Sequence, residues 1–261
     1  MWIFILIVLA VVIYFVMSQA SSSNQASKAS SRTQASKASS QNYNTNQVDY
    51  SNLEVSLESD VLGQDYTHLR DLLAEGKWRQ ADQETGRVML SVGNLAVDIK
   101  IRSGEYKYAT VDNHRVSCQS ADYFPCTDLC TIDRLWLKYS NGRFGFSLQK
   151  RIISELGEDA LSLLSFKKRG KGTDSQALKE RIELREEFIK RIGWYNHYSD
   201  KGSNATKQYN DLTFAIQAPY GHLPTAYYWE EGHGSFTKNE PLNDSVLLAI
   251  LNRLLSCGIS L

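Results

Sequence analysis

The segment that decides the fold class is Phe124-Pro-Cys-Thr-Asp-Leu-Cys-Thr-Ile-Asp-Arg-Leu-Trp-Leu-Lys-Tyr-Ser-Asn-Gly-Arg-Phe-Gly-Phe-Ser-Leu-Gln149. Asn141-Gly142 can supply the left-handed backbone that ends a helix, and a second amphipathic stretch follows this turn. Before the turn, apolar and aromatic side chains recur three and four residues apart, which places them on one face of a helix. They are Leu129, Ile132, Leu135, Trp136 and Tyr139. The segment therefore predicts two helices joined by a tight turn.

Helical periodicity extends through most of the remaining chain. Residues 66–76 and 78–89 predict an antiparallel helical hairpin that turns near Gly76. Residues 146–156, 173–192 and 242–255 each carry an apolar stripe at helical spacing. Residues 97–111 are compatible with either a short extended piece or a helix. Since no segment has convincing strand alternation, we expect an all-α fold with a single helical domain and a buried aromatic centre that includes Trp78, Trp136 and Phe146.

The amino-terminal region has a different composition. Residues 2–17 are apolar and uncharged, close to the shortest stretch that spans a bilayer as a helix. Residues 19–48 are rich in Ser, Gln, Ala and Lys and offer little apolar surface to bury. We expect a transmembrane anchor at 1–18, a disordered linker at 19–48 and a folded domain at 49–261. A cleaved signal peptide is the alternative.

Charge and cysteine content restrict the classes of function and compartment. Lys28, Arg32 and Lys37 follow the apolar run, which favours a single-pass protein with its domain on the cytoplasmic or stromal side. The formal net charge is +0, and the part beyond the linker is slightly acidic, which argues against nucleic-acid binding.

The four cysteines lack zinc-ligand spacing. They are Cys118, Cys126, Cys130 and Cys257. We interpret them as thiols in a reducing compartment rather than as disulfide or metal ligands.

Motifs for catalysis are missing from the sequence. It contains no phosphate-binding loop, no dinucleotide fingerprint, no nucleophile elbow and no zinc-protease helix. The five histidines are scattered, and we interpret each as a surface or capping residue rather than a base or ligand. Glu230, Glu231 and His233 form a weak candidate metal cluster. The sequence therefore predicts a protein that is not an enzyme and holds no metal.

Three ordered blocks of sequence resemble one protein family. The quoted 124–149 segment is similar to the signature of the genomes-uncoupled-four family of porphyrin-binding regulators of magnesium chelatase. Residues 66–85 resemble the helical hairpin that opens the same domain. Gly193-Trp194 and the segment 214–224, which ends in Gly221-His-Leu-Pro224, resemble its later landmarks. The resemblance covers roughly residues 64 to 225.

The resemblance implies that the chain binds a tetrapyrrole as its ligand. Expected ligands are protoporphyrin IX or Mg-protoporphyrin IX, and the expected partner is the large subunit of magnesium chelatase in chlorophyll biosynthesis. The loops of such a domain form an open cleft lined here by Trp194, His222, Leu223 and Pro224. Less central candidates form the floor of the cleft or the core beneath it. They are Phe144, Phe146 and Leu148. The membrane in question is the plasma membrane or thylakoid of a photosynthetic organism.

Aromatic residues and bases bear on this expected site. Nine aromatic residues lie between 194 and 229, and aromatic rings in loops can cover a flat apolar ligand. About half of them are expected to fill the core instead. The two propionates of a porphyrin favour nearby Arg or Lys, yet residues 208–237 contain neither. The candidates for contacts to the propionates are Lys190 with Arg191, or the run 167–169. The alternative function is a membrane-tethered tetrapyrrole sensor or interaction scaffold that does not act on chelatase.

Overall fold

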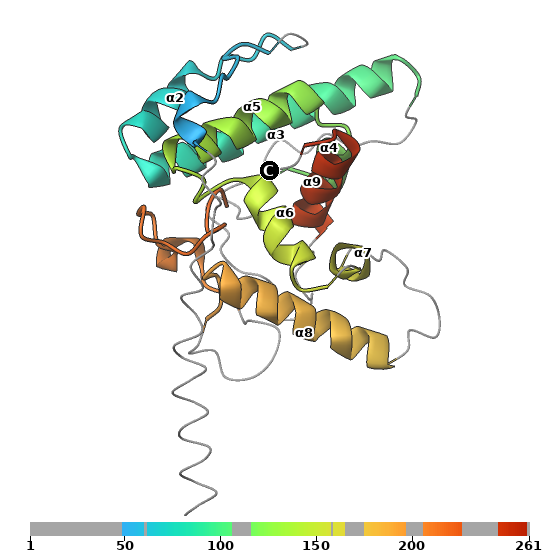
Figure 1. The fold of residues 1–261 in the computed structure, drawn as a ribbon. Coiled ribbons are helices and arrows are strands. Elements are labelled where there is room, and N and C mark those ends of the chain that lie inside the picture. Colours follow the sequence, from blue (N-terminus) through green and yellow to red (C-terminus); the bar gives the residue numbers. More distant parts are fainter. Residues whose placement is uncertain are drawn as a thin grey trace, which may run out of the picture. The chain divides into compact units, whose positions relative to one another are not determined.

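The structure, a computed structural model, describes seven stretches of the chain. They are residues 49–59, 62–105, 116–157, 159–164, 175–196, 206–225 and 245–259. The secondary structure of this described part is helical, and its only bridges are two isolated backbone pairs. This confirms the all-α prediction for the part that the structure describes (Figure 1). The elements are η1 (Tyr50–Asn52), α2 (Thr67–Ala74), α3 (Trp78–Arg102), α4 (Cys118–Asp122), α5 (Cys126–Tyr139), α6 (Phe146–Ser154), α7 (Ala160–Leu164), α8 (Ser175–Arg191), η2 (Tyr209–Asp211) and α9 (Ser245–Ser256).

The α2–α3 hairpin matches its prediction. Gly76 turns the chain with a positive φ of 68°, and α2 packs against both α3 and α5. Residues 97–102, for which the sequence is compatible with a helix or an extended piece, are helical, and residues 106–111 lie outside the described residues. Helix α3 thus continues to Arg102. It does so because Val92, Ala96 and Val97 are buried. At Gly93, a Cβ atom would lie 2.8 Å from the Cβ of Ser120 on α4. The absence of a side chain at this position therefore lets α4 pack directly against α3.

The signature segment also folds as predicted. It forms α5 and α6, and the turn between them uses φ values of 52° at Asn141 and 72° at Gly142. The ring of Tyr50 in η1 occupies the space beside Gly142 that a Cβ atom would need. The turn therefore depends on glycine for both its backbone angle and its packing.

The aromatic centre joins α3 to α5. Trp136 is fully buried, and its indole N–H donates to the hydroxyl of Thr85 at 3.0 Å. Its ring lies 6.2 Å from the rings of both Trp78 and Phe144. Phe146 is fully buried, as predicted. Trp78 also packs in this centre, as predicted, but as the first residue of α3 it is only partly buried.

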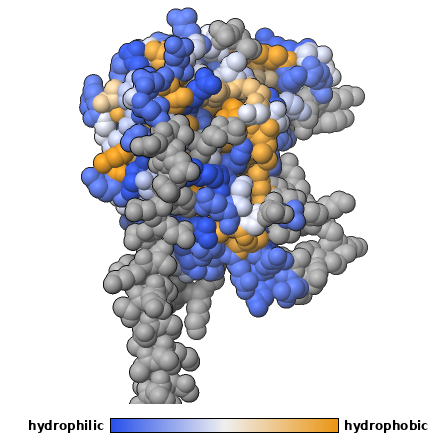
Figure 2. All heavy atoms as spheres, viewed as in Figure 1, coloured by the Kyte–Doolittle hydropathy of each residue, from blue (hydrophilic) through white to orange (hydrophobic). Residues whose placement is uncertain are grey.

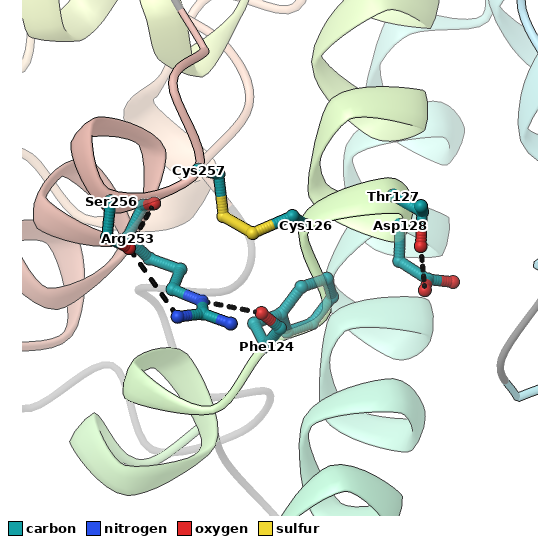
Figure 3. Close-up of a disulfide and its surroundings, with 7 residues drawn as sticks. All are labelled: Phe124, Cys126, Thr127, Asp128, Arg253, Ser256 and Cys257. Atoms are coloured by element: carbon teal, nitrogen blue, oxygen red, sulfur yellow. Dashed lines mark hydrogen bonds between the residues drawn. A yellow bond between two sulfur atoms is a disulfide. The ribbon is translucent and has the colours of Figure 1, made fainter.

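A disulfide fixes α9 to the rest of the domain. Cys126 at the start of α5 is bonded to Cys257 just after α9, with 5.4 Å between the Cα atoms (Figure 3). The interpretation of these two cysteines as free thiols is therefore wrong. The pairing spans a sequence separation of 131 residues, which no local spacing pattern can indicate. Helix α9 is also held by its buried face of Ile250, Leu251 and Leu254, against α4, α5, α6 and α7.

The amino-terminal expectations fall on residues that the structure does not describe. The anchor at 1–18 and the linker at 19–48 lie outside the described residues, so the domain boundaries stay predictions. Within the described part, no helix combines the length and apolar character that crossing a bilayer requires.

We expect Trp136→Ala to lower the free energy of unfolding by about 3–5 kcal/mol, because it leaves a cavity and removes the partner of Thr85. Chemical denaturation followed by circular dichroism measures this change. Leu255→Ala is the matched control, since Leu255 is 52% exposed and its loss should change stability by less than about 0.5 kcal/mol. An unchanged transition midpoint for Trp136→Ala would show that this ring is not part of the core.

Candidate ligand-binding site

The loop at 206–225 brings the predicted site residues together. It packs beside the turn that follows α8, where Gly193 has a φ of 77°. Trp194 comes directly after this turn, and its indole N–H donates to the carbonyl of His222 at 2.9 Å. Trp194 is only 1% exposed, and the void beside it has a volume of about 10 Å³. Trp194 therefore fixes the loop from its buried side, through the hydrogen bond to His222.

His222 is fixed through both of its ring nitrogens. The backbone N–H of Thr213 donates to Nε2 at 3.1 Å, so Nε2 must carry a lone pair. Nδ1 then carries the proton and donates to the carbonyl of Ile192 at 2.6 Å. Burial lowers the pKa of His222 from 6.5 to about 4. The ring is therefore neutral at pH 7. The interpretation of His222 as a surface or capping residue is wrong, since it is fully buried.

Backbone contacts fasten Leu223 and Pro224 to α6. The N–H of Gly145 donates to the carbonyl of Leu223 at 3.0 Å. The side-chain amide of Gln149 donates to the carbonyls of Gly221 and Pro224, at 3.0 and 3.1 Å. The peptide bond between Leu223 and Pro224 is cis, and both residues are buried. This end of the loop is thus a rigid attachment to the start of α6.

The remaining predicted site residues occupy two other environments. Phe144, Phe146 and Leu148 are fully buried in the core below the loop. Lys190 and Arg191 lie at the end of α8 and form ion pairs with acids of the same helix, at 3.3 Å to Glu186 and 3.0 Å to Glu187. The run 167–169, the aromatic residues 227–229 and the Glu230, Glu231 and His233 cluster lie outside the described residues.

Asp82 attaches the loop to α3. Its buried carboxylate accepts hydrogen bonds from the backbone N–H of Thr225, from the Thr225 hydroxyl at 2.8 Å and from the Tyr209 hydroxyl at 3.0 Å. Tyr209 and Thr225 lie near opposite ends of the loop. A single carboxylate therefore fixes both ends, a role for which no local motif in the sequence gives a signal.

Half-exposed arginine and aromatic side chains line the outer side of this attachment. The guanidinium of Arg79 lies 4.2 Å from the ring centre of Phe214 and 5.7 Å from that of Tyr209. The two rings are 5.1 Å apart, and Arg79 also donates to the side chain of Asn210 at 3.1 Å. We call Arg79, Tyr209 and Phe214 the arginine–aromatic cluster. A second arginine also lies over an aromatic ring: the guanidinium of Arg143 is 4.3 Å from the ring centre of Tyr220.

Arginines from distant parts of the chain thus lie beside residues 208–225 of the loop, which contain no Lys or Arg. Arg79 belongs to the first turn of α3, and Arg143 to the turn between α5 and α6. Sequence reasoning missed both, because only the folded chain places them beside the loop. In the view of Figure 2 the apolar side chains of the described residues form several areas divided by polar side chains.

The neutral, buried His222 predicts a specific loss of stability in acid. Between pH 6.5 and about 4 the unfolded chain binds a proton at His222 that the folded chain does not. Stability therefore falls as the pH falls through this window, by about 3 kcal/mol. Urea unfolding at pH 7 and pH 4.5 measures the change. His222→Gln should be less stable at pH 7 but should lose less on acidification. An equal loss in both proteins would contradict the assignment.

Comparisons with known proteins agree on one family. The sequence model of the GUN4-like family matches residues 58–234. The chain is 34% identical over 91 residues to a tetrapyrrole-binding, chloroplastic protein of Arabidopsis thaliana, covering 35% of this chain and 29% of that protein. It is 25% identical over 162 residues to a Ycf53-like protein of Synechocystis, covering 62% of this chain and 51% of that protein. The matches thus span about half or less of these relatives.

Among solved structures, that of GUN4 from Chlamydomonas reinhardtii is similar with a TM-score of 0.43 and 22% identity, covering 78% of this chain and 96% of that one. The ligand-free Arabidopsis thaliana GUN4 gives a TM-score of 0.41 and 21% identity, covering 71% and 90%. The family match covers more than half of the sequence and includes the α2–α3 hairpin, the signature segment and the loop at 206–225. The chain belongs to the GUN4-like family.

Proposed function

We propose that the chain binds a tetrapyrrole without converting it, and that the arginine–aromatic cluster forms part of the binding surface. Membership of the GUN4-like family and similarity to a protein named for tetrapyrrole binding support this proposal. The observation that carries it is the position of Arg79 over the half-exposed rings of Phe214 and Tyr209. In this cluster a cation and apolar rings are available at the same place.

A porphyrin presents two kinds of surface, and the cluster complements both. Its flat apolar face can stack on the rings of Phe214 and Tyr209. Its propionates can each accept two parallel hydrogen bonds from a guanidinium, which Arg79 can provide from the edge of the rings. Arg143, in the turn between α5 and α6, supplies a second guanidinium beside the same loop, next to Tyr220. Lys190 and Arg191 remain candidates for propionate contacts, in competition with Glu186 and Glu187.

The buried residues have a different role in this proposal. Trp194, His222, Leu223 and Pro224 hold the loop in shape rather than covering the ligand. Phe144, Phe146 and Leu148 form the core on which the loop rests. A ligand would reach these side chains only if the loop moved, because each is buried in the structure. We therefore place the proposed open cleft on the solvent side of these buried side chains.

The energy of such binding suits a carrier or sensor. Burying about 300 Å² of macrocycle at about 25 cal/mol/Å² gives roughly 7 kcal/mol before the costs of association. Without those costs this energy alone would correspond to a dissociation constant near the micromolar range, so the propionate contacts must offset the costs. A ligand bound this weakly is released on a useful timescale. We propose protoporphyrin IX and Mg-protoporphyrin IX as ligands, and stimulation of magnesium chelatase through its large subunit, by a domain tethered to a membrane through residues 1–18.

Substitutions in the arginine–aromatic cluster test the binding surface. We expect Phe214→Ala and Arg79→Met each to weaken porphyrin binding by about 1–3 kcal/mol, through lost apolar burial and lost propionate contacts respectively. Titration of the full chain with protoporphyrin IX, followed by Soret absorbance and quenching of Trp fluorescence, measures the affinity. The magnesium form of the ligand, titrated in parallel, reports ligand preference.

Matched controls use one residue of each type away from the cluster. Arg70→Met removes a partly exposed arginine of α2, and Leu255→Ala removes an exposed apolar side chain of α9. Neither should change the affinity. If all four variants bind as tightly as the wild type, the site lies elsewhere. If the wild type itself does not bind either porphyrin, the alternative function as an interaction scaffold of the same fold is favoured.

A further inference from the structure

A groove lies along α5, on the side where the carboxyl terminus of α9 ends. Its volume is about 560 Å³. One wall is the segment at 50–59 and the opposite wall is the segment at 257–259. The two bonded cysteines, Cys126 and Cys257, both line this groove and are half-buried, and Cys130 lies one helical turn further along its floor. The disulfide is thus open to a reagent that enters the groove.

We propose that the Cys126–Cys257 disulfide is a reversible redox lock, which a dithiol protein opens from this groove to release the segment at 257–259. This proposal does not depend on the tetrapyrrole function, since none of its residues belongs to the arginine–aromatic cluster or to the loop at 206–225.

The chemistry is exchange of one disulfide for another. A thiolate of the dithiol protein attacks Sγ of Cys257 and forms a mixed disulfide, and Cys126 leaves as a thiolate. The second thiol of the reductant then attacks the mixed disulfide, which frees Cys257 as a thiol and leaves the reductant oxidised. Two electrons and two protons pass from the reductant to Cys126 and Cys257.

The position of Cys126 decides which sulfur is attacked. Cys126 is the first residue of the 14-residue helix α5, where the helix dipole stabilises a thiolate. The sulfur that forms the more stable thiolate is the better leaving group, so the attack falls on Cys257. The carboxylate of Asp128 does not oppose this effect directly. It points to the other side of α5 (Figure 3), where it accepts hydrogen bonds from Tyr66 and Ser59.

Cys130 does not open the bond by itself. It is a free thiol in the same groove, but burial raises its pKa, against a smaller opposing effect of Arg134. A raised pKa lowers the fraction of reactive thiolate at neutral pH. A single thiol could also only exchange into the disulfide and not reduce it, so the two electrons must come from a reductant outside the chain, which approaches through the groove.

Contacts around the disulfide define what opening releases. Helix α9 stays in place through its buried Ile250, Leu251 and Leu254, and through Arg253, which donates to the carbonyl of Phe124 at 2.7 Å (Figure 3). Beyond α9, the carbonyl of Ile259 accepts from Lys150 at 2.7 Å. After reduction the segment keeps this hydrogen bond and the backbone turn at Gly258 but no covalent link to α5, so it opens more often. One wall of the groove thereby loses its covalent attachment while the helical core remains.

The test uses the full chain in its disulfide form and a thioredoxin whose resolving cysteine is serine, so that the mixed disulfide accumulates. Mass spectrometry should find this thioredoxin bonded to Cys257. With intact thioredoxin, Cys257 should become open to alkylation without denaturant, and hydrogen exchange of residues 257–259 should rise about tenfold. Exchange in α5 should stay unchanged.

Cysteine variants provide the matched controls. Cys126→Ser should show the fast exchange at 257–259 without any reductant, whereas Cys130→Ser and Cys118→Ser should behave as the wild type. Trapping of thioredoxin on Cys126 would overturn the assignment of the attacked sulfur. Alkylation of Cys257 only after denaturation, or equal exchange in the two redox forms, would overturn the lock and leave a purely structural disulfide.

Discussion

The carboxylate of Asp82 is the interaction on which the arrangement of the candidate site depends. It is fully buried on α3 and accepts hydrogen bonds from Tyr209 and Thr225, which lie near opposite ends of one loop. A buried carboxylate without partners is strongly destabilising, so the loop and the helix hold each other in place. The same attachment places Tyr209 and Phe214 beside Arg79.

The loop at 206–225 and the side chains that contact it form an inner and an outer set of residues. The inner set is buried and makes fixed hydrogen bonds, as Trp194 does to His222 and His222 does to Ile192. The outer set is half-exposed and consists of rings paired with guanidinium groups. A rigid inner layer that presents a polar and aromatic outer layer limits the entropy lost when a ligand binds. The disulfide on α5 belongs to neither set.

Local sequence patterns predict the elements and not the long-range contacts. The stripe from Leu129 to Tyr139 and the Asn141-Gly142 turn predict α5 and its end, because helix periodicity and left-handed turns depend on neighbouring residues. The pairing of Cys126 with Cys257 and the placement of Arg79 beside Phe214 depend on tertiary structure. Trp194 and His222 were assigned to one site, and they do lie together. Their burial, however, depends on how closely the loop packs, which sequence motifs do not reveal.

The protoporphyrin affinity of Asp82→Asn in the full chain tests most directly whether Asp82 holds the candidate site together. Asparagine keeps the size of the side chain but turns one acceptor into an N–H₂ donor, which faces the donors of Tyr209 or Thr225. The loop should then lose one attachment. The account predicts that the helical circular dichroism is retained while the affinity falls at least about tenfold, or about 1.4 kcal/mol. Unchanged affinity in a folded Asp82→Asn protein would contradict it.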